Sequence, residues 1–179
     1  TLQDVEVQLG LRVDGLPVAG STDRVWRDYC EEMLGVRPTA TSHGRGGKMN
    51  LTWLSKQFTH GLLDDAEQQQ VIRYTRAYML TIFGGWVFAD KSGSLVHLMF
   101  LQLMEDFGQV GQYSWGGACL AWLYRQLCRA AEIGGAVILL QVWAWDRFPH
   151  IAPRRPWGSQ FVQGCPLAYR WETNKDTTH

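Results

Sequence analysis

Apolar residues recur at the spacing of one helix face in the segment Thr22–Leu34. Charged residues occupy most positions between them, and the stripe consists of Val25, Trp26, Tyr29, Cys30, Met33 and Leu34. Such a pattern is typical of an amphipathic α-helix, whose apolar side packs against a core. Gly35 follows directly, and glycine often ends a helix because it adopts the left-handed backbone conformation easily. We therefore predict a helix over Thr22–Leu34.

Two shorter helices are indicated by their capping residues. Thr1 and Asp4 form a capping-box pattern ahead of an apolar face, and Gly10 is placed to end that helix. Asn50 precedes a second apolar face and can cap its first turn. The predicted helices are Thr1–Leu9, with Leu2, Val5 and Leu9 on one face, and a short helix after Asn50, with Leu51, Leu54 and Phe58.

Two longer helices are predicted in the middle of the chain. Asp64 or Asp65 can cap a long helix that reaches Phe83, and the pair Gly84–Gly85 is predicted to end it. The segment Ser94–Phe107 is apolar almost all round, which indicates a central, buried helix.

A further helix is predicted from an N-cap at Ser114 to about Glu132. Its apolar stripe consists of Leu120, Leu123, Tyr124, Leu127, Cys128 and Ala131. Cys119 lies on the flank of this stripe, where we expect it to act as a small apolar filler. The pair Gly116–Gly117 is unfavourable in a helix interior, so we expect another backbone to approach closely there.

The apolar run Ala136–Trp145 suits either a strand or a buried helix, and helix is favoured because no partner strand is evident elsewhere. It follows the pair Gly134–Gly135, which is expected to break the preceding helix. Residues 37–49 have loop composition, and prolines dominate the chain after Phe148. The predicted fold class is all-α: an irregular multi-helix bundle with a proline-rich, irregular C-terminal segment. We expect one domain over residues 1–171 and a disordered tail over residues 172–179.

Composition narrows the class of protein. The chain has 179 residues, of which 46% are hydrophobic and 9 are tryptophan, so a sizeable aromatic core is expected. Lys+Arg and Asp+Glu both number 17, and this balance argues against strong, sequence-independent binding of nucleic acid.

The longest apolar stretch is too short to cross a bilayer and no signal-peptide pattern opens the chain, so we expect no membrane association. Scattered cysteines without C-x-x-C spacing predict free thiols in a reduced, intracellular setting.

Cys119 is the strongest candidate for catalytic chemistry, because a thiol near a helix start can have a lowered pKa. A cysteine nucleophile also needs a base, and the histidines are distant in sequence and form no recognisable signature: His43, His60, His97 and His150. We therefore interpret Cys119 as structural, with a cryptic cysteine hydrolase as the alternative. His97 lies in an apolar segment and is interpreted as a core histidine. No His or Cys pair has the spacing of a zinc site.

The stretch "GRGGKMN", Gly44–Asn50, matches a phosphate-binding loop only in part. Ser42 stands where the motif needs its first glycine, and Met49 replaces its Ser or Thr. The carboxylate pairs Asp64–Asp65 and Glu105–Asp106 are adjacent in sequence and would diverge around a helix. We accordingly predict no catalytic, cofactor-binding or metal-binding residue, and no cofactor.

Two groups of residues are candidates for contact with a partner. Trp122 lies opposite the predicted stripe, so either its helix is buried on two sides or Trp122 marks a partner surface. A basic-aromatic cluster near the C-terminus suits a phosphate or partner contact, or a solvated loop. The candidate residues are Trp122, Arg125 and Arg129 in the first group, and Arg147, Arg154, Arg155 and Trp157 in the second.

The segment "YSWGGACLAWLYRQLCRAA" at Tyr113–Ala131, followed by "GGAVILLQVWAWDRF" at Gly134–Phe148, resembles the plant mobile domain, the maintenance-of-meristems family. Further segments agree in order from residue 1 to about residue 171: "TLQDVEVQLGLRVDGLPVAG", "LTWLSKQF", "RAYMLTIFGGWVFAD" and "LMFLQLMEDF". The resemblance implies a largely helical nuclear protein that takes part in meristem development and maintenance, genome integrity and transposon silencing. It brings no established catalytic residues.

The resemblance also implies protein partners in the nucleus, including a phosphatase-like protein, because some relatives carry a fused phosphatase domain. The metal motifs of that domain, D-x-H and G-D-x-H-G, are absent from this sequence. The lysines, Lys48, Lys56, Lys91 and Lys175, lack the context of a pyridoxal-phosphate enzyme, so neither phosphatase nor aminotransferase activity is expected. We expect a non-enzymatic interaction module. The alternative is a transposon-derived, nucleic-acid-associated module that uses Arg147, Arg154 and Arg155.

Family members usually have a further segment before the one that matches "TLQDV" and another after "PLAYRW". We therefore expect this chain to be the central part of a longer domain, truncated at both ends. The missing helices would cover apolar faces that this chain leaves open.

Overall fold

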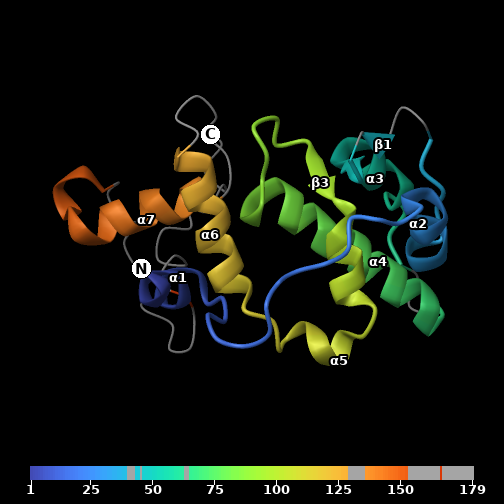
Figure 1. The fold of residues 1–179 in the computed structure, drawn as a ribbon, viewed down its shortest axis with the longest axis horizontal. Helices are drawn as coiled ribbons and strands as arrows, with labels where there is room; N and C mark the ends of the chain where they lie inside the picture. Colours follow the sequence, from blue (N-terminus) through green and yellow to red (C-terminus); the bar gives the residue numbers. More distant parts are fainter. Residues whose placement is uncertain (40–42, 45, 63–64, 129–135, 153–165, 167–179) are drawn as a thin grey trace, which may run out of the picture.

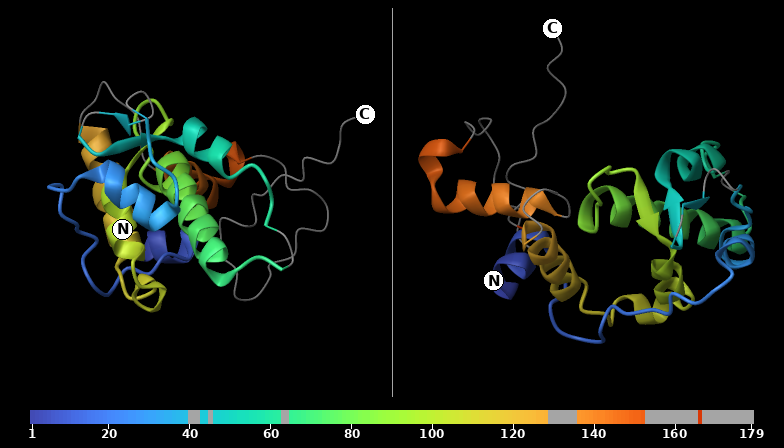
Figure 2. Two further views of the ribbon diagram at one scale, coloured as in Figure 1. Left: turned by 90° about the vertical axis from the view of Figure 1, so that its right-hand side faces the viewer. Right: turned by 45° about the horizontal axis from the view of Figure 1, so that its top comes forward.

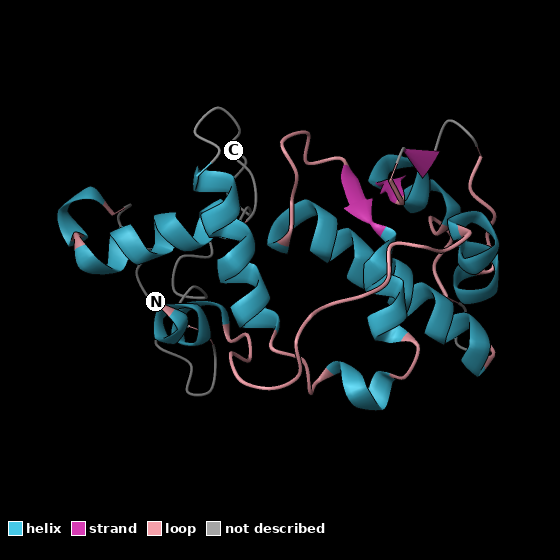
Figure 3. Cartoon of the chain, in the orientation of Figure 1, coloured by secondary structure: helices cyan, strands magenta, loops and turns pink. Residues whose placement is uncertain are grey.

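The computed structural model describes residues 1–39, 43–44, 46–62, 65–128, 136–152 and 166. It is largely α-helical, as predicted, with one small sheet (Figures 1 and 3). In chain order the elements are α1 (Leu2–Leu9), α2 (Trp26–Leu34), β1 (His43–Gly44), β2 (Lys48–Asn50), α3 (Leu51–Gln57), α4 (Gln68–Ile82), the π-helical turn η1 (Phe83–Val87), β3 (Leu95–His97), the 3₁₀ helix η2 (Leu98–Met104), α5 (Phe107–Val110), α6 (Trp115–Cys128), α7 (Val137–Arg147) and the 3₁₀ turn η3 (Pro149–Ile151).

The elements gather into two lobes that share α6 (Figures 1 and 2). One lobe contains α2 to α5, η1, η2 and the sheet, and its core includes Leu54, Leu80 and Leu101. The other consists of α1, α6 and α7 around a smaller core that includes Val5 and Leu139. The fold is therefore an irregular helical assembly with two separate cores.

Helix α6 is buried on two sides. Trp115 belongs to the core of the larger lobe, and Trp122 packs against that core. Cys119 and Leu123 belong to the core of the smaller lobe, with exposed fractions of 0% and 2%. Burial of α6 on two sides, the first of the two alternatives, is therefore observed, while Trp122 itself is only half-buried and its role as a partner surface stays a prediction.

The predicted apolar stripe of α6 is confirmed at Leu123, which lies in the core of the smaller lobe, and is wrong at its C-terminal positions. Tyr124 and Leu127 are exposed at 55% and 43%, and Cys128 is exposed as well. The buried positions are Trp115, Gly116, Cys119, Leu123 and Gln126. Because apolar residues surround most of α6, its sequence fits several stripes, and the packing of two lobes selects the face that is buried.

The start signals of α1 and α3 and the stop signals of α1 and α2 were predicted correctly. Thr1 and Asp4 form the capping box of α1, and Gly10 ends that helix in the left-handed conformation, as Gly35 does for α2. The Asn50 side chain accepts a hydrogen bond from the Trp53 N–H at the start of α3. The run at Ala136–Trp145 is the helix α7, as favoured.

Two helix starts differ from the prediction. Helix α2 begins at Trp26, later than Thr22, and helix α4 begins at Gln68 behind Glu67, which makes no capping bond with its side chain. Asp65 therefore does not cap α4, and Asp64 lies outside the described residues. Polar residues ahead of a helix favour a turn at several positions, so the composition does not single out one start.

The loop predicted over residues 37–49 contains part of a sheet. Strand β2 pairs antiparallel with β1 on one side and with β3 on the other, in the order β1-β2-β3. Between β1 and β2, Gly46 and Gly47 adopt φ values of 76° and 73°, which only glycine tolerates easily. Gly46 and Gly47 therefore form a turn that leads into β2.

The single helix predicted over Ser94–Phe107 is not formed. The segment begins with β3, continues as the 3₁₀ helix η2 and reaches α5. Val96 is 1% exposed and pairs with Met49 of β2. An apolar run indicates burial, but it does not specify whether the backbone forms a helix or a strand. Here pairing with β2 makes the start of the segment a strand.

The glycine pair after α4 does not end the helical segment. Gly84 and Gly85 lie within η1, a π-helical turn that continues α4. A side chain at Gly84 would meet the Cβ of Val96 at 2.6 Å, so this glycine allows β3 to pack directly on the turn. The predicted break at Gly134–Gly135, the domain end at residue 171 and the tail 172–179 lie outside the described residues.

The first turn of α6 lies against the segment that follows α1. The Gly116 N–H donates to the Arg12 carbonyl at 2.7 Å, and the Ser114 hydroxyl donates to the Val13 carbonyl at 2.7 Å. A Cβ at Gly116 would lie 2.8 Å from the Leu11 carbonyl oxygen. The expected close approach of another backbone is confirmed at Gly116, and the backbone carbonyl of Arg12 satisfies one donor of the helix start.

A buried arginine joins three elements of the larger lobe. Arg76 of α4 is 7% exposed, and its guanidinium donates to the carbonyls of Met33, Met104 and Glu105 at 3.1, 3.0 and 3.1 Å. These carbonyls lie at the ends of α2 and η2, where the helices leave acceptors unsatisfied and where positive charge is favourable. Arg76 therefore fixes the positions of α2 and η2 on α4.

Replacing Arg76 by methionine keeps an apolar stem but leaves three carbonyls without a donor. We expect Arg76→Met to lower the free energy of unfolding by about 3 kcal/mol, measured by urea denaturation. Arg37→Met is the control, because Arg37 is exposed and pairs with Asp28 and Glu31 on the surface. Its expected loss is under about 1 kcal/mol. An equal loss of unfolding free energy in the two variants would show that Arg76 does not hold α2 and η2 on α4.

Adding one methyl group at Gly116 forces α6 away from the segment behind it. We expect Gly116→Ala to destabilise the chain by about 1–3 kcal/mol, seen as a lower thermal midpoint. Gly111→Ala is the matched control, because no atom lies within 4 Å of a Cβ built there. That substitution is expected to stay within about 0.5 kcal/mol of the parent. A neutral Gly116→Ala would show that the two backbones do not need this contact.

Candidate functional site

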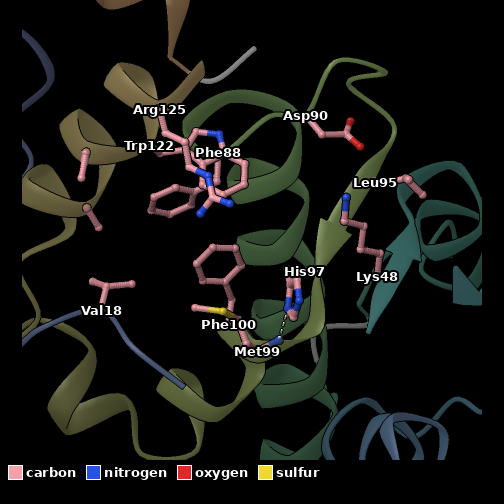
Figure 4. A pocket seen from close by; sticks show the side chains of 12 residues that line it. Val18, Lys48, Phe88, Asp90, Leu95, His97, Met99, Phe100, Trp122 and Arg125 are labelled. Atoms are coloured by element: carbon pink, nitrogen blue, oxygen red, sulfur yellow. Dashed lines mark hydrogen bonds between the residues drawn. The ribbon is translucent and has the colours of Figure 1, made fainter. Parts of the chain in front are cut away.

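A groove opens between α6 and β3 on the side of the molecule where the two lobes meet. It has a volume of about 270 Å³. Figure 4 shows Trp122 and Arg125 on the side of α6, His97 and Lys48 on the side of the sheet, and aromatic rings between them. The lining residues are Val18, Lys48, Phe88, Asp90, Leu95, His97, Met99, Phe100, Ala118, Ala121, Trp122 and Arg125.

The base of the groove is an aromatic cluster. Phe88 and Phe100 stack with ring centroids 4.6 Å apart, and Trp122 meets Phe88 edge to face at 6.2 Å. The Trp122 indole N–H donates to the Ala89 carbonyl at 3.2 Å, which holds the ring in place. The groove therefore has a rigid apolar base, because each ring packs on another and the polar edge of Trp122 is satisfied.

The opposite wall is made by the sheet. His97 pairs with Lys48 across β3 and β2, so their side chains emerge on the same face. The His97 Nδ1 accepts a hydrogen bond from the Met99 N–H at 3.1 Å, and the ring meets Trp26 edge to face. These contacts agree with the interpretation of His97 as a core histidine whose ring is hydrogen-bonded. His97 lies on a strand, however, and not in a helix.

Positive charge dominates the rim. Among the described residues, neither Lys48 nor Arg125 has an ion pair, and Asp90 accepts hydrogen bonds from the N–H and hydroxyl of Ser92. The pKa of His97 is lowered, first by burial and second by the positive charge of Lys48 nearby. His97 is therefore favoured in its neutral form, and two cations remain available to a bound group.

The structure brings only part of the predicted contact residues together. Trp122 and Arg125 lie side by side on the groove. Arg147 lies on α7, where its guanidinium pairs with Asp4 at 3.2 Å and stands over the Trp143 ring. It therefore links α7 to α1. The remaining candidates, Arg129, Arg154, Arg155 and Trp157, lie outside the described residues.

Two of the cysteines in the described part of the chain, Cys30 and Cys119, are buried in the cores. Cys119 and Cys30 are both 0% exposed, and burial raises the pKa of their thiols to about 11 and about 12. Cys128 is exposed on α6. A thiol with a raised pKa is a poor nucleophile at neutral pH, so the environment of Cys119 favours the interpretation as a core filler.

The sequence also raised a metal site, a phosphate loop and a membrane span as alternatives. Within the described part of the chain, no group of three or more His, Cys, Asp or Glu side chains is placed to hold a metal ion. The stretch considered as a phosphate loop contains the turn at Gly46 and Gly47 and strand β2. None of the described helices combines the length and apolar character that a bilayer span requires.

Sequence reasoning missed most of the groove. Lys48, Phe88, His97 and Phe100 come from segments separated along the chain, and no local pattern marks them as neighbours. The sequence signal for this site was the set of aromatic residues in "IFGGWVFAD" and "LVHLMF". These residues suggested a buried core and not the lining of a groove. Trp122 was found because it stands apart from the predicted stripe.

The family model of the plant mobile domain matches residues 1–179. Among curated proteins of Arabidopsis thaliana, "Serine/threonine-protein phosphatase 7 long form homolog" is 41% identical over 97% of this chain and 14% of its own length. "Protein MAIN-LIKE 2" is 38% identical over 96% of this chain and 26% of its own length. "Protein MAINTENANCE OF MERISTEMS" is 35% identical over 96% of this chain and 36% of its own length.

This chain therefore spans between about a seventh and about a third of the length of these relatives. No solved structure matches it. The match of the family model to the whole sequence agrees with the motifs at Tyr113–Ala131 and Gly134–Phe148. The chain belongs to the plant mobile domain family.

Proposed function

We propose that this chain is a non-enzymatic interaction module that binds a protein partner in the nucleus through the groove between α6 and β3. The observation that carries the proposal is the combination of a rigid aromatic base with two rim cations, Lys48 and Arg125, that have no ion pair among the described residues. Anchoring apolar pockets with a charged rim are typical of protein-recognition sites.

The relatives support a role as a module within larger proteins. Each of them extends well beyond the matched region, and one carries the name of a serine/threonine-protein phosphatase. A phosphatase-like protein is therefore our candidate partner. The name "MAINTENANCE OF MERISTEMS" on another relative supports a role in meristem maintenance, and the resemblance of the family adds genome integrity and transposon silencing.

The proposed lack of cysteine chemistry can be tested directly. Because burial raises the pKa of Cys119 to about 11, roughly one molecule in a thousand carries its thiolate at about pH 8. We expect a thiol reagent to modify exposed Cys128 in the folded chain while Cys30 and Cys119 stay unmodified, as measured by peptide mass spectrometry. All three are expected to react in denaturant. Modification of Cys119 before Cys128 would instead support the hydrolase alternative.

Partner capture tests the interaction itself. We expect the tagged chain, cross-linked in intact plant nuclei, to enrich a defined protein partner, with a phosphatase-like protein among the candidates. Ala121→Gln extends a neutral side chain from α6 into the groove and is expected to reduce recovery about tenfold. Tyr124→Gln changes an exposed residue of the same helix outside the groove lining and is expected to leave recovery unchanged. Exclusion of the chain from nuclei, or no enriched protein, would refute the proposal.

A further inference from the structure

We propose that the groove binds an extended acidic peptide segment, which places an apolar side chain over Phe88 and Phe100 and its carboxylates at Lys48 and Arg125. This inference deepens the proposed function and rests on it, because it names the chemistry of the partner segment. It is argued from the size of the groove, the charge of its rim and the free edge of β3.

The size of the groove favours a peptide side chain over a larger ligand. Its volume of about 270 Å³ lies below the range of about 300–1,000 Å³ that is usual for small-molecule pockets. The walls are mostly apolar, with Ala118 and Ala121 on one side and Leu95 on the other. Such a space accepts one large apolar side chain, and the rest of the ligand must then lie along the rim.

The charge of the rim selects an acidic partner. Lys48 and Arg125 approach the groove from opposite walls, as Figure 4 shows. Asp90, the acidic residue among the lining residues, is already held by Ser92. Carboxylates on both sides of an apolar anchor can therefore meet one cation on each wall, whereas a basic segment would face two like charges.

The free edge of β3 selects an extended backbone. Ser94 accepts a hydrogen bond from the Leu51 N–H, and the Leu98 N–H donates to the Gly47 carbonyl, so these positions bond toward β2. Antiparallel pairs alternate in bonding direction, and the N–H groups of Leu95 and His97 therefore point away from β2. Among the described residues no strand pairs with the edge of β3 that faces α6, so a peptide can pair with this edge while its side chain enters the groove (Figure 1).

The test measures binding of short blocked peptides to the full chain. The acidic peptide carries a tryptophan flanked by aspartate and glutamate. Its counterparts replace the acids by their amides or by lysine. We expect the acidic peptide to bind about tenfold more tightly than the amide peptide, by fluorescence anisotropy at low salt. Equal affinity for the acidic and amide peptides, or tighter binding of the lysine peptide, would overturn the proposal.

Charge reversal locates the binding. Arg125→Glu and Lys48→Glu are each expected to weaken the acidic peptide about tenfold. Lys56→Glu is the matched control, because Lys56 is an exposed cation on α3 away from the groove lining, and its effect is expected to stay within about twofold. Circular dichroism checks that all variants fold. An equal loss with Lys56→Glu would mean attraction by overall charge and would overturn the assignment.

Two further readouts separate the alternatives. Amide chemical shifts should change at Leu95 and His97 when the acidic peptide binds. Changes at Tyr78 and Trp86, which are both 68% exposed and line a different pocket, would assign binding to a different surface and overturn the proposal. A single-stranded DNA oligonucleotide that binds more tightly than the peptide and displaces it would assign the groove to nucleic acid and also overturn it.

Failure of this inference and failure of the proposed function give different results. If nuclear capture recovers a partner through Ala121 but Arg125→Glu leaves that capture unchanged, the interaction function stands and the acidic-peptide assignment fails. If capture recovers no partner while the acidic peptide binds with the expected charge dependence, the groove chemistry stands and the nuclear function fails.

Discussion

The whole arrangement depends on one helix that is packed on two sides. Trp115 of α6 stacks on Phe83 with ring centroids 4.7 Å apart, inside the core of the larger lobe. Cys119 and Leu123 of the same helix fill the core of the smaller lobe. Because one rigid element contributes to both cores, the two lobes hold a defined orientation, and any change that shifts α6 moves the groove between them.

The groove follows from this arrangement and from the aromatic residues beneath it. Phe88 and Phe100 stack on each other at the base of the groove, and Trp122 meets Phe88 edge to face. Arg76 stabilises the larger lobe independently of α6, because its hydrogen bonds to three carbonyls hold α2 and η2 on α4. A rigid base with two rim cations suits recognition of a partner, since little ordering is needed on binding.

Predictability differed between elements for physical reasons. The ends of α1, α2 and α3 were predicted from Thr1, Gly35 and Asn50, because a cap acts on backbone groups within the same turn. The segment Ser94–Phe107 was assigned wrongly as one helix, because its apolar residues fit a strand and a 3₁₀ helix equally well. Of the groove, only Trp122 and Arg125 were predicted, since they share one helix face.

By itself, the sequence determined the helical class, the caps and stops of several helices, the burial of Cys119 and the motifs of the plant mobile domain. These depend on neighbours along the chain or on the identity of single residues. Tertiary structure alone decided which face of α6 is buried, and it alone placed Lys48 and His97 opposite Arg125. Those outcomes depend on contacts between segments far apart in sequence, where an apolar residue can satisfy its burial against more than one partner.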